Sequence, residues 1–208
     1  MSRLEKKHPL AIRWFHWINF PLLALMIWSG ILIYWAYPAV FTLDQSTWRA
    51  LKVNNRLAEG MALHFFFMWL FGVNGVLYVL YTLVSGEWRE LVPRRDSFRE
   101  AWQVLLHDLR IRKEPLPPGK FNGAQRIAYT TVVLMGLGSL LSGLAIYKPV
   151  QFAWLTVPFG GYQGARLVHF WLTAGYCAFF VVHIAQVIRA GWNNFRAMVI
   201  GYEVTHER

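Results

Sequence analysis

Residues 164–190, GARLVHFWLTAGYCAFFVVHIAQVIRA, decide the fold of this chain. Between Arg166 and Arg189 the stretch has no formal charge for 22 residues, which is long enough to cross a bilayer as a helix. It nevertheless contains His169 and His183, and ionisable groups inside a membrane are costly and tend to mark function. Fourteen positions at about 100° each bring both rings to nearly one helix face, about 21 Å apart along the axis. The stretch therefore predicts a spanning helix with one histidine toward each membrane surface.

Three further blocks of the 208-residue chain are free of charged side chains and equally long. The chain is 56% hydrophobic and 17% aromatic, and each block meets the length that a spanning helix needs. We expect an all-α integral membrane four-helix bundle that forms one domain over residues 1–208. The predicted spans lie near 14–37, 61–85, 124–147 and 165–189. Residues 97–109 have apolar side chains at helical spacing, which predicts an amphipathic helix in the loop between the second and third spans.

The net charge of +10 invites a nucleic-acid interpretation, but the distribution of the charge argues against it. Of the 21 lysines and arginines, one side of the predicted topology holds only five: Arg49, Lys52, Arg56, Lys148 and Arg166. Cytoplasmic loops carry an excess of basic residues, so both termini are predicted to be cytoplasmic. A cleaved signal peptide is the alternative for the first span, but its apolar run is too long and contains His16.

The histidines of the predicted spans fall into two pairs by depth. His16 and His183 lie near the inner face, whereas His64 and His169 lie near the outer face. Each pair could hold one haem iron, because imidazole is a standard axial ligand. Cys177 is the single cysteine and there is no CxxCH motif, so such haems would be b-type. Iron with both axial positions filled has no vacant site for small molecules, and electron transfer is then the expected role.

Alternatives remain for these and the neighbouring residues. A lone transmembrane histidine is more often a hydrogen-bonded core residue or part of a proton path, and only the depth pairing favours ligation. The third span has no histidine, and its glycines and serines would make room for porphyrin. No internal repeat is evident beyond the loose symmetry of the histidines. Four arginines edge the membrane at haem depth and could contact propionates or lipid headgroups: Arg13, Arg126, Arg166 and Arg189. Three histidines outside the spans are expected at the solvated surface: His8, His107 and His206.

Several motifs together resemble the prokaryotic cytochrome b561-like family, the b-type cytochrome subunits of nickel–iron hydrogenases, formate dehydrogenases and thiosulfate-reductase-like complexes. They are RWFHW (13–17), LHFFFMWLFG (63–72), EWRELVP and SFREAW (87–93 and 97–102), RLVHFWLTAGYCAFFVVH (166–183) and the tail HIAQVIRAGWNNFRAMVIGY (183–202). The resemblance implies a bacterial inner-membrane protein that holds two haem b groups. It also implies a quinone, menaquinone or ubiquinone, beside the inner haem. The family's quinone segment is KFNGAQR (120–126) here, which puts Asn122, Ala124 and Gln125 at that site. A helix cap is the alternative role for Asn122.

The resemblance implies an electron-transfer subunit that connects an extracytoplasmic redox partner to the quinone pool. The partner would be a molybdopterin enzyme or a nickel–iron hydrogenase, and the short outer loops favour a molybdopterin subunit. Quinone turnover is the only candidate reaction of the chain itself. Two alternatives remain: a stand-alone superoxide:quinone oxidoreductase of b561 type, and a haem-free transport or assembly subunit that uses its histidines as proton relays.

Overall fold

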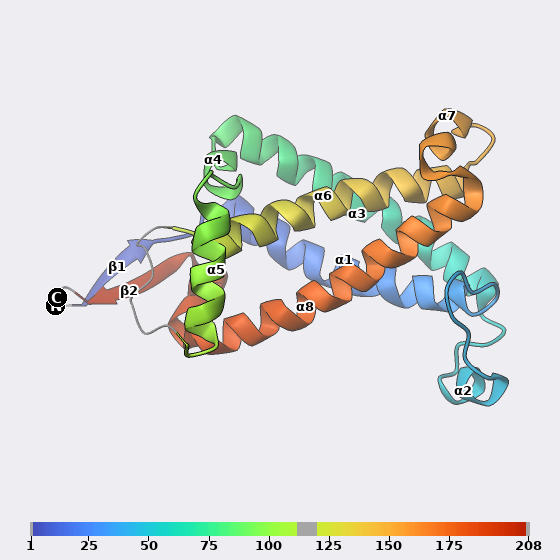
Figure 1. The fold of residues 1–208 in the computed structure, drawn as a ribbon, viewed down its shortest axis with the longest axis horizontal. Coiled ribbons are helices and arrows are strands. Elements are labelled where there is room, and N and C mark those ends of the chain that lie inside the picture. The colour runs from blue at the N-terminus through green and yellow to red at the C-terminus, as the bar shows by residue number, and fades with distance from the viewer. Residues whose placement is uncertain (1, 112–119, 207–208) are drawn as a thin grey trace. The chain divides into compact units, whose positions relative to one another are not determined.

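Four long helices dominate the computed structural model, which describes residues 2–111 and 120–206 (Figure 1). They are α1 (Leu10–Tyr34), α3 (Leu57–Ser85), α6 (Gly123–Tyr147) and α8 (Gly161–Ile200). Within the described part of the chain, these are the four helices that are long and apolar enough to cross a membrane. The predicted all-α set of four spans is therefore confirmed.

The surfaces of these helices are apolar, as lipid contact requires. Large side chains such as Phe66, Trp69 and Val181 are exposed. Backbone polar groups are meanwhile paired inside each helix, which is the condition for crossing hydrocarbon. The chain is thus a multi-pass integral membrane protein.

The helix ends differ from the predicted bounds where proline and glycine act on the backbone. Pro9 is the N-cap of α1, which begins at Leu10 rather than near residue 14 and ends at Tyr34, before Pro38. The last helix continues to Ile200, past the predicted end at 189, but it is interrupted at Gly191. Gly191 has φ 78° and ψ 178°, a conformation that glycine adopts without the steric cost of a Cβ. The interruption separates the apolar span from the segment after it.

The chain divides into two compact units, whose boundaries fall inside α3 and α6. The first unit comprises Met1–Tyr78 and Gly138–Arg208, and the second comprises Val79–Leu137. All four histidines of the predicted pairs belong to the first unit.

The two chain ends meet in the first unit as a two-stranded antiparallel sheet, which the sequence analysis did not predict. Strands β1 (Ser2–Lys6) and β2 (Tyr202–His206) pair with Leu4 opposite Val204. We call this the terminal end of the unit. Opposite it lies the loop end, formed by α2 (Gln45–Ala50), α7 (Ala153–Thr156) and the short helix η1 (Val157–Phe159) (Figure 1).

Side chains hold the segment after Gly191 against the terminal end. The amide of Asn193 donates to the Val204 carbonyl at 2.9 Å, and its oxygen accepts from the Val204 N–H at 3.0 Å. The Lys7 ammonium lies 2.8 Å from Glu203. The Trp17 indole donates to the Met198 carbonyl at 3.1 Å, which joins this segment to α1.

Close packing near the loop end sets the approach of α1 to α3. Leu32 is fully buried with Trp48 and Val53. A Cβ on Gly60 would lie only 2.7 Å from the Leu32 Cβ, closer than carbon atoms approach. Glycine at this position therefore lets the two helices meet one turn away from His64.

The second unit contains α4 (Trp88–Leu91), α5 (Ser97–Asp108) and the start of α6. A helix is thus present where the sequence predicts an amphipathic one, but its location on a membrane surface stays a prediction. Ser97 could have formed a capping box with Glu100, yet its hydroxyl accepts from the Arg94 N–H at 2.8 Å and α5 begins without a side-chain cap. A Cβ on Gly123 would lie 2.3 Å from the Ser97 carbonyl oxygen, so glycine permits α6 to start against α5.

Candidate functional site

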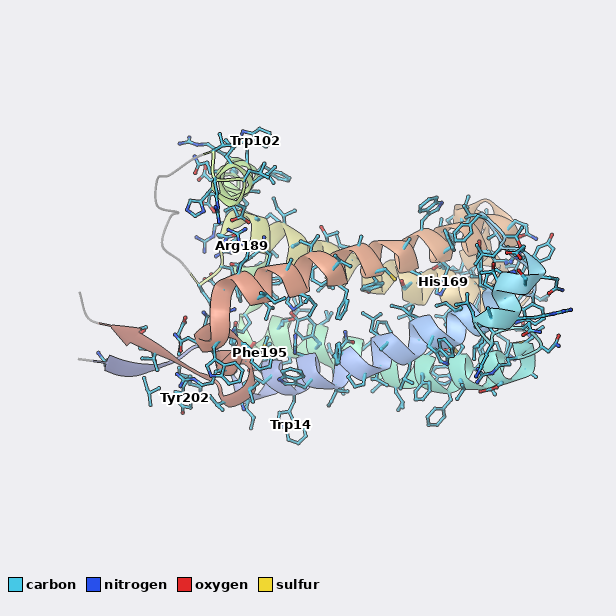
Figure 2. The ribbon with its side chains drawn as sticks, turned by 90° about the horizontal axis from the view of Figure 1, so that it is seen from below. Trp14, Trp102, His169, Arg189, Phe195 and Tyr202 are labelled. Atoms are coloured by element: carbon cyan, nitrogen blue, oxygen red, sulfur yellow. The ribbon has the colours of Figure 1, made fainter. Side chains whose placement is uncertain are left out.

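Two histidine pairs lie at different levels of the first unit. At the loop end, the rings of His64 on α3 and His169 on α8 face each other with centroids 6.2 Å apart and planes at 73°. We call this the distal pair. Figure 2 shows His169 at the loop end of α8, whereas Arg189 and Tyr202 lie toward the terminal end.

The second pair, which we call the terminal pair, joins α1 to α8. The rings of His16 and His183 also have centroids 6.2 Å apart, with planes at 55°. The structure therefore brings together both of the pairs that depth in the sequence predicts. Since His169 and His183 share α8, fourteen residues separate the two levels by about 21 Å.

The separation of the rings fits iron held between two imidazoles. A metal–nitrogen bond of about 2.0 Å on each side, with ordinary ring dimensions, puts two axial imidazole centroids about 6.3 Å apart. The ring centroids of both pairs are 6.2 Å apart, which is close to this value. Direct hydrogen bonding between two rings would bring them closer. Among the described residues no three histidine, cysteine, aspartate or glutamate side chains gather as the ligands of a bare ion would. The pairs thus suit an iron whose other ligands come from a porphyrin.

Hydrogen bonds fix the tautomer of the distal rings. The Ser29 hydroxyl lies 2.9 Å from Nδ1 of His64 and donates its proton to the Leu25 carbonyl at 2.7 Å. Because that proton is used, the ring must be the donor, so Nδ1 carries hydrogen and Nε2 keeps a lone pair. Ser142 stands in the same relation to His169, at 3.0 Å. A histidine that binds iron through Nε2 needs this tautomer, in which Nδ1–H is hydrogen-bonded and Nε2 keeps its lone pair.

The sequence analysis did not predict the role of these serines, because it treated the serines of the third span as space for porphyrin and assigned no role to Ser29. A signal was present in the repeated pattern S-G-x-x-I-Y, which occurs at residues 29–34 and 142–147. The expectation of no internal repeat beyond the histidines is therefore wrong.

The terminal rings have a different setting. Nδ1 of His16 is buried and has no hydrogen-bond partner in the described part of the chain. His183 instead stacks on Phe179, with ring centroids 5.5 Å apart and planes at 13°. Ring contacts are thus the interactions that the described structure shows for this pair.

The four arginines predicted near propionates have distinct partners. Arg13 donates to the Val199 carbonyl, and its Nε is buried without a partner among the described residues. Arg166 donates to Gln163 at 2.8 Å and to the Tyr37 carbonyl, with its guanidinium over the Tyr37 ring. Arg126 is buried in the second unit and bonds to Glu90 at 2.5 Å, so its position is explained by an ion pair. Arg189 also interacts with another group of the protein, so it is not without a partner.

Arg13 and Arg166 occupy matching places in the sequence, three residues before His16 and His169 respectively. Residues three apart lie on one helix face. These two arginines therefore remain the stronger candidates for contact with an acidic group beside each pair.

The predicted quinone segment opens α6 in the second unit. The Gln125 N–H donates to the side-chain oxygen of Asn122 at 2.9 Å, and the Asn122 N–H donates to the side-chain oxygen of Gln125 at 3.0 Å. This reciprocal pair is a capping box, which satisfies free N–H groups at the helix start. Ala124 lies between them in the first turn. The capping role open to Asn122 is therefore filled, and quinone contact by these residues stays a prediction.

The remaining histidines also differ from one another. His107 is partly exposed, with Nδ1 3.9 Å from Asp108. His8 was expected at the solvated surface but is buried, because the paired chain ends pack around it near Gly201. The side chain of His206 lies outside the described residues.

Comparison with known proteins identifies a family and a relative. The family model described as prokaryotic cytochrome b561 matches residues 7–201. The putative protein-methionine-sulfoxide reductase subunit YedZ1 of Azospira oryzae is 32% identical over 182 residues, which cover 86% of this chain and 89% of that protein. The matched range contains the four paired histidines and all four long helices. The chain therefore belongs to the prokaryotic cytochrome b561 family.

Proposed function

We propose that this protein is a dihaem b-type cytochrome that anchors an extracytoplasmic redox partner and transfers electrons between that partner and membrane quinone. The observation that carries the proposal is the pair of facing imidazole sets, each with centroids 6.2 Å apart, at two levels of four apolar helices. The predicted orientation puts the terminal end in the cytoplasm and the loop end on the partner's side.

In this proposal His64 and His169 hold one haem, and His16 and His183 hold the other. Each bound haem would supply one-electron chemistry through its iron. With two histidines of the chain holding each haem, electron transfer rather than binding of a small molecule would be the expected role. The exposed apolar side chains of the helices would face lipid, and the backbone carbonyls of the helices stay paired internally.

Arg13 and Arg166 would each hold a propionate in this scheme. Arg13 brings a buried nitrogen that has no protein partner in the described structure, one helical turn before His16. Arg166 is anchored by Gln163 and Tyr37 one turn before His169. Arg189 remains a candidate, whereas Arg126 is already paired with Glu90.

For quinone, we propose the start of α6 with Asn122, Ala124 and Gln125. The support is the KFNGAQR segment and its likeness to the family's quinone-lining pattern. Gln125 and Asn122 hold each other through two hydrogen bonds, which leaves the second lone pair of each side-chain oxygen and the amide N–H groups for a ligand.

The partner we propose is a molybdopterin enzyme outside the cytoplasm. The similar protein of Azospira oryzae is named as a subunit of a protein-methionine-sulfoxide reductase. Removing the oxygen of a sulfoxide is chemistry for an oxygen-transfer enzyme rather than for a hydrogenase. The relative's name thus favours the molybdopterin class over the nickel–iron class.

Haem stoichiometry in detergent-purified protein tests the proposal. We expect two haem b per chain in the wild type and one in His169→Ala and in His183→Ala, because each change removes one axial ligand of a different pair. His107→Ala is the matched control, since His107 lies outside the four spans, and it should keep two. Retention of two haems in either span variant would refute the ligand assignment.

Purification of the partner separates the anchor from a stand-alone quinone reductase. A tagged chain in mild detergent should retain a molybdopterin-containing subunit when its native membrane is the source. If the chain is recovered alone with both haems and reduces quinone with superoxide, the stand-alone alternative is correct.

A further inference from the structure

Two buried serines stand in the same relation to the two distal histidines. Ser29 and Ser142 have no exposed surface, and each hydroxyl donates to the carbonyl four residues earlier at 2.7 Å. Each also accepts from Nδ1 of a histidine on another helix, at 2.9 Å and 3.0 Å.

The residues beyond the serines repeat the arrangement. Tyr34, five residues after Ser29, stacks on Phe170 with centroids 5.2 Å apart. Tyr147, five residues after Ser142, contacts Phe65 at 4.7 Å. Each phenylalanine follows its histidine directly in the sequence. The half made of α1 and α3 and the half made of α6 and α8 therefore exchange corresponding tyrosine–phenylalanine contacts across the distal pair, stacked in one case and edge-on in the other.

The glycines that follow the serines complete the likeness. A Cβ on Gly30 would lie 3.6 Å from Cε1 of His64, and a Cβ on Gly143 would lie 3.4 Å from Cε1 of His169. Serine supplies the hydrogen-bond acceptor and glycine keeps the helix surface low beside the ring. Each half thus holds one histidine ring through Nδ1 and leaves Nε2 of that ring with a free lone pair.

In the terminal pair, His16 lacks this arrangement within the described part of the chain. Nδ1 of His16 is buried with no partner among the residues that the structure describes. A histidine ligand is more basic and better oriented when the N–H of its other ring nitrogen is hydrogen-bonded than when that N–H has no partner. The chain therefore gives its two pairs unequal support.

We propose that Ser29 and Ser142 are equivalent positioning residues of the distal site, which fix the Nδ1–H tautomer of both ligands and make the distal centre harder to reduce than the terminal one. This inference rests on the proposed function, since it requires haem at both pairs. Stronger electron donation from both ligands stabilises the oxidised iron. At equilibrium an electron in the chain then resides mainly at the terminal centre.

The test replaces each serine by alanine and uses Ser139→Ala as the control. Ser139 lies on α6 three residues before Ser142, and no hydrogen bond between its hydroxyl and His169 is found among the described residues. The control therefore removes a hydroxyl without removing a bond to the ring. Alanine deletes one oxygen atom from a helix that tolerates alanine well, so the variants should fold. A spectroscopic redox titration should show one step for each haem. The step that is absent from the His169→Ala protein is assigned to the distal haem.

We expect Ser29→Ala and Ser142→Ala each to weaken distal haem retention by at least about tenfold, as loss of a ligand's outer partner does. Each should also move the distal step toward easier reduction and leave the terminal step unchanged. The double variant should lose more distal haem and shift the distal step further than either single variant. Ser139→Ala should match the wild type in both measurements.

Two results would overturn the inference without touching the proposed function. One is wild-type distal behaviour in both serine variants while two haems are present. The other is an equal change in Ser139→Ala protein or at the terminal step. If the wild-type chain holds no haem, the proposed function itself is wrong.

Discussion

Gly60→Ala should loosen the contact between α1 and α3 that sets the geometry of His64. The new Cβ would lie 2.7 Å from the Leu32 Cβ and 3.0 Å from the Leu32 carbonyl carbon. Carbon atoms pack best at about 3.5–4.0 Å, so the two helices must separate locally by about 1 Å. Neither contact can be relieved by rotating a side chain, because Leu32 is fully buried and its backbone is part of the contact.

The separation acts on the distal site because His64 lies one turn after Gly60 and Ser29 one turn before Leu32. A movement of about 1 Å would take the 2.9 Å bond between Ser29 Oγ and His64 Nδ1 beyond hydrogen-bond range. Overpacking costs about 1–3 kcal/mol and the lost bond about 1 kcal/mol. Alanine regains up to about 1 kcal/mol of helix propensity, which leaves a net loss of about 1–3 kcal/mol.

The assay is reversible unfolding in detergent, followed by circular dichroism so that it does not depend on haem. Gly75→Ala is the matched control, since it lies on the same helix and a Cβ there has no neighbour within 4 Å. The control should be neutral or slightly more stable. Equal unfolding free energies for the Gly60 and Gly75 variants would refute the packing argument.

Three further predictions concern other parts of the chain. Asn193→Ala should release β2, because it loses both bonds to Val204, and hydrogen exchange of residues 202–206 should accelerate; unchanged exchange would contradict this. The hydroxyls and amides at the start of α2, with the Ser46 hydroxyl first, lower the pKa of Asp44 to about 2. Its capping therefore stabilises α2 above the ordinary pKa of about 4 and is lost as the pH falls toward 2, which exchange of the α2 amides measures; protection that stays constant over this range would exclude the effect. Glu90→Gln should lower the unfolding free energy by about 1.5–3 kcal/mol, since it weakens a charged bond to buried Arg126, and equal denaturation midpoints would argue against it.

Much of the architecture could be predicted because membrane insertion depends on local composition. A run such as residues 167–188 must be helical in hydrocarbon, whatever lies beside it, since its backbone has no other partner. Depth along each helix then pairs His16 with His183 and His64 with His169. The paired chain ends were missed because two five-residue strands far apart in sequence have no local signal that specifies their partner.

The distal site illustrates a different limit. Ser29 and Ser142 are ordinary small residues in a span, and nothing in the sequence alone assigns either of them a histidine partner. Only contact between helices decides whether such a hydroxyl meets a ring nitrogen or points into lipid. The repeated S-G-x-x-I-Y pattern was visible, but its meaning depends on which histidine each copy faces.

The sequence by itself determined four apolar spans, the excess of basic residues on one predicted side, the depth of each histidine and membership of a cytochrome family. The tertiary structure decided the 6.2 Å approach of the rings, the serine partners of the distal pair and, among the described residues, the lack of a partner for Nδ1 of His16. The physical reason is that solvation by lipid acts on each helix separately. Ligand geometry instead requires atoms from different helices to meet within tenths of an ångström, which only their mutual packing can set.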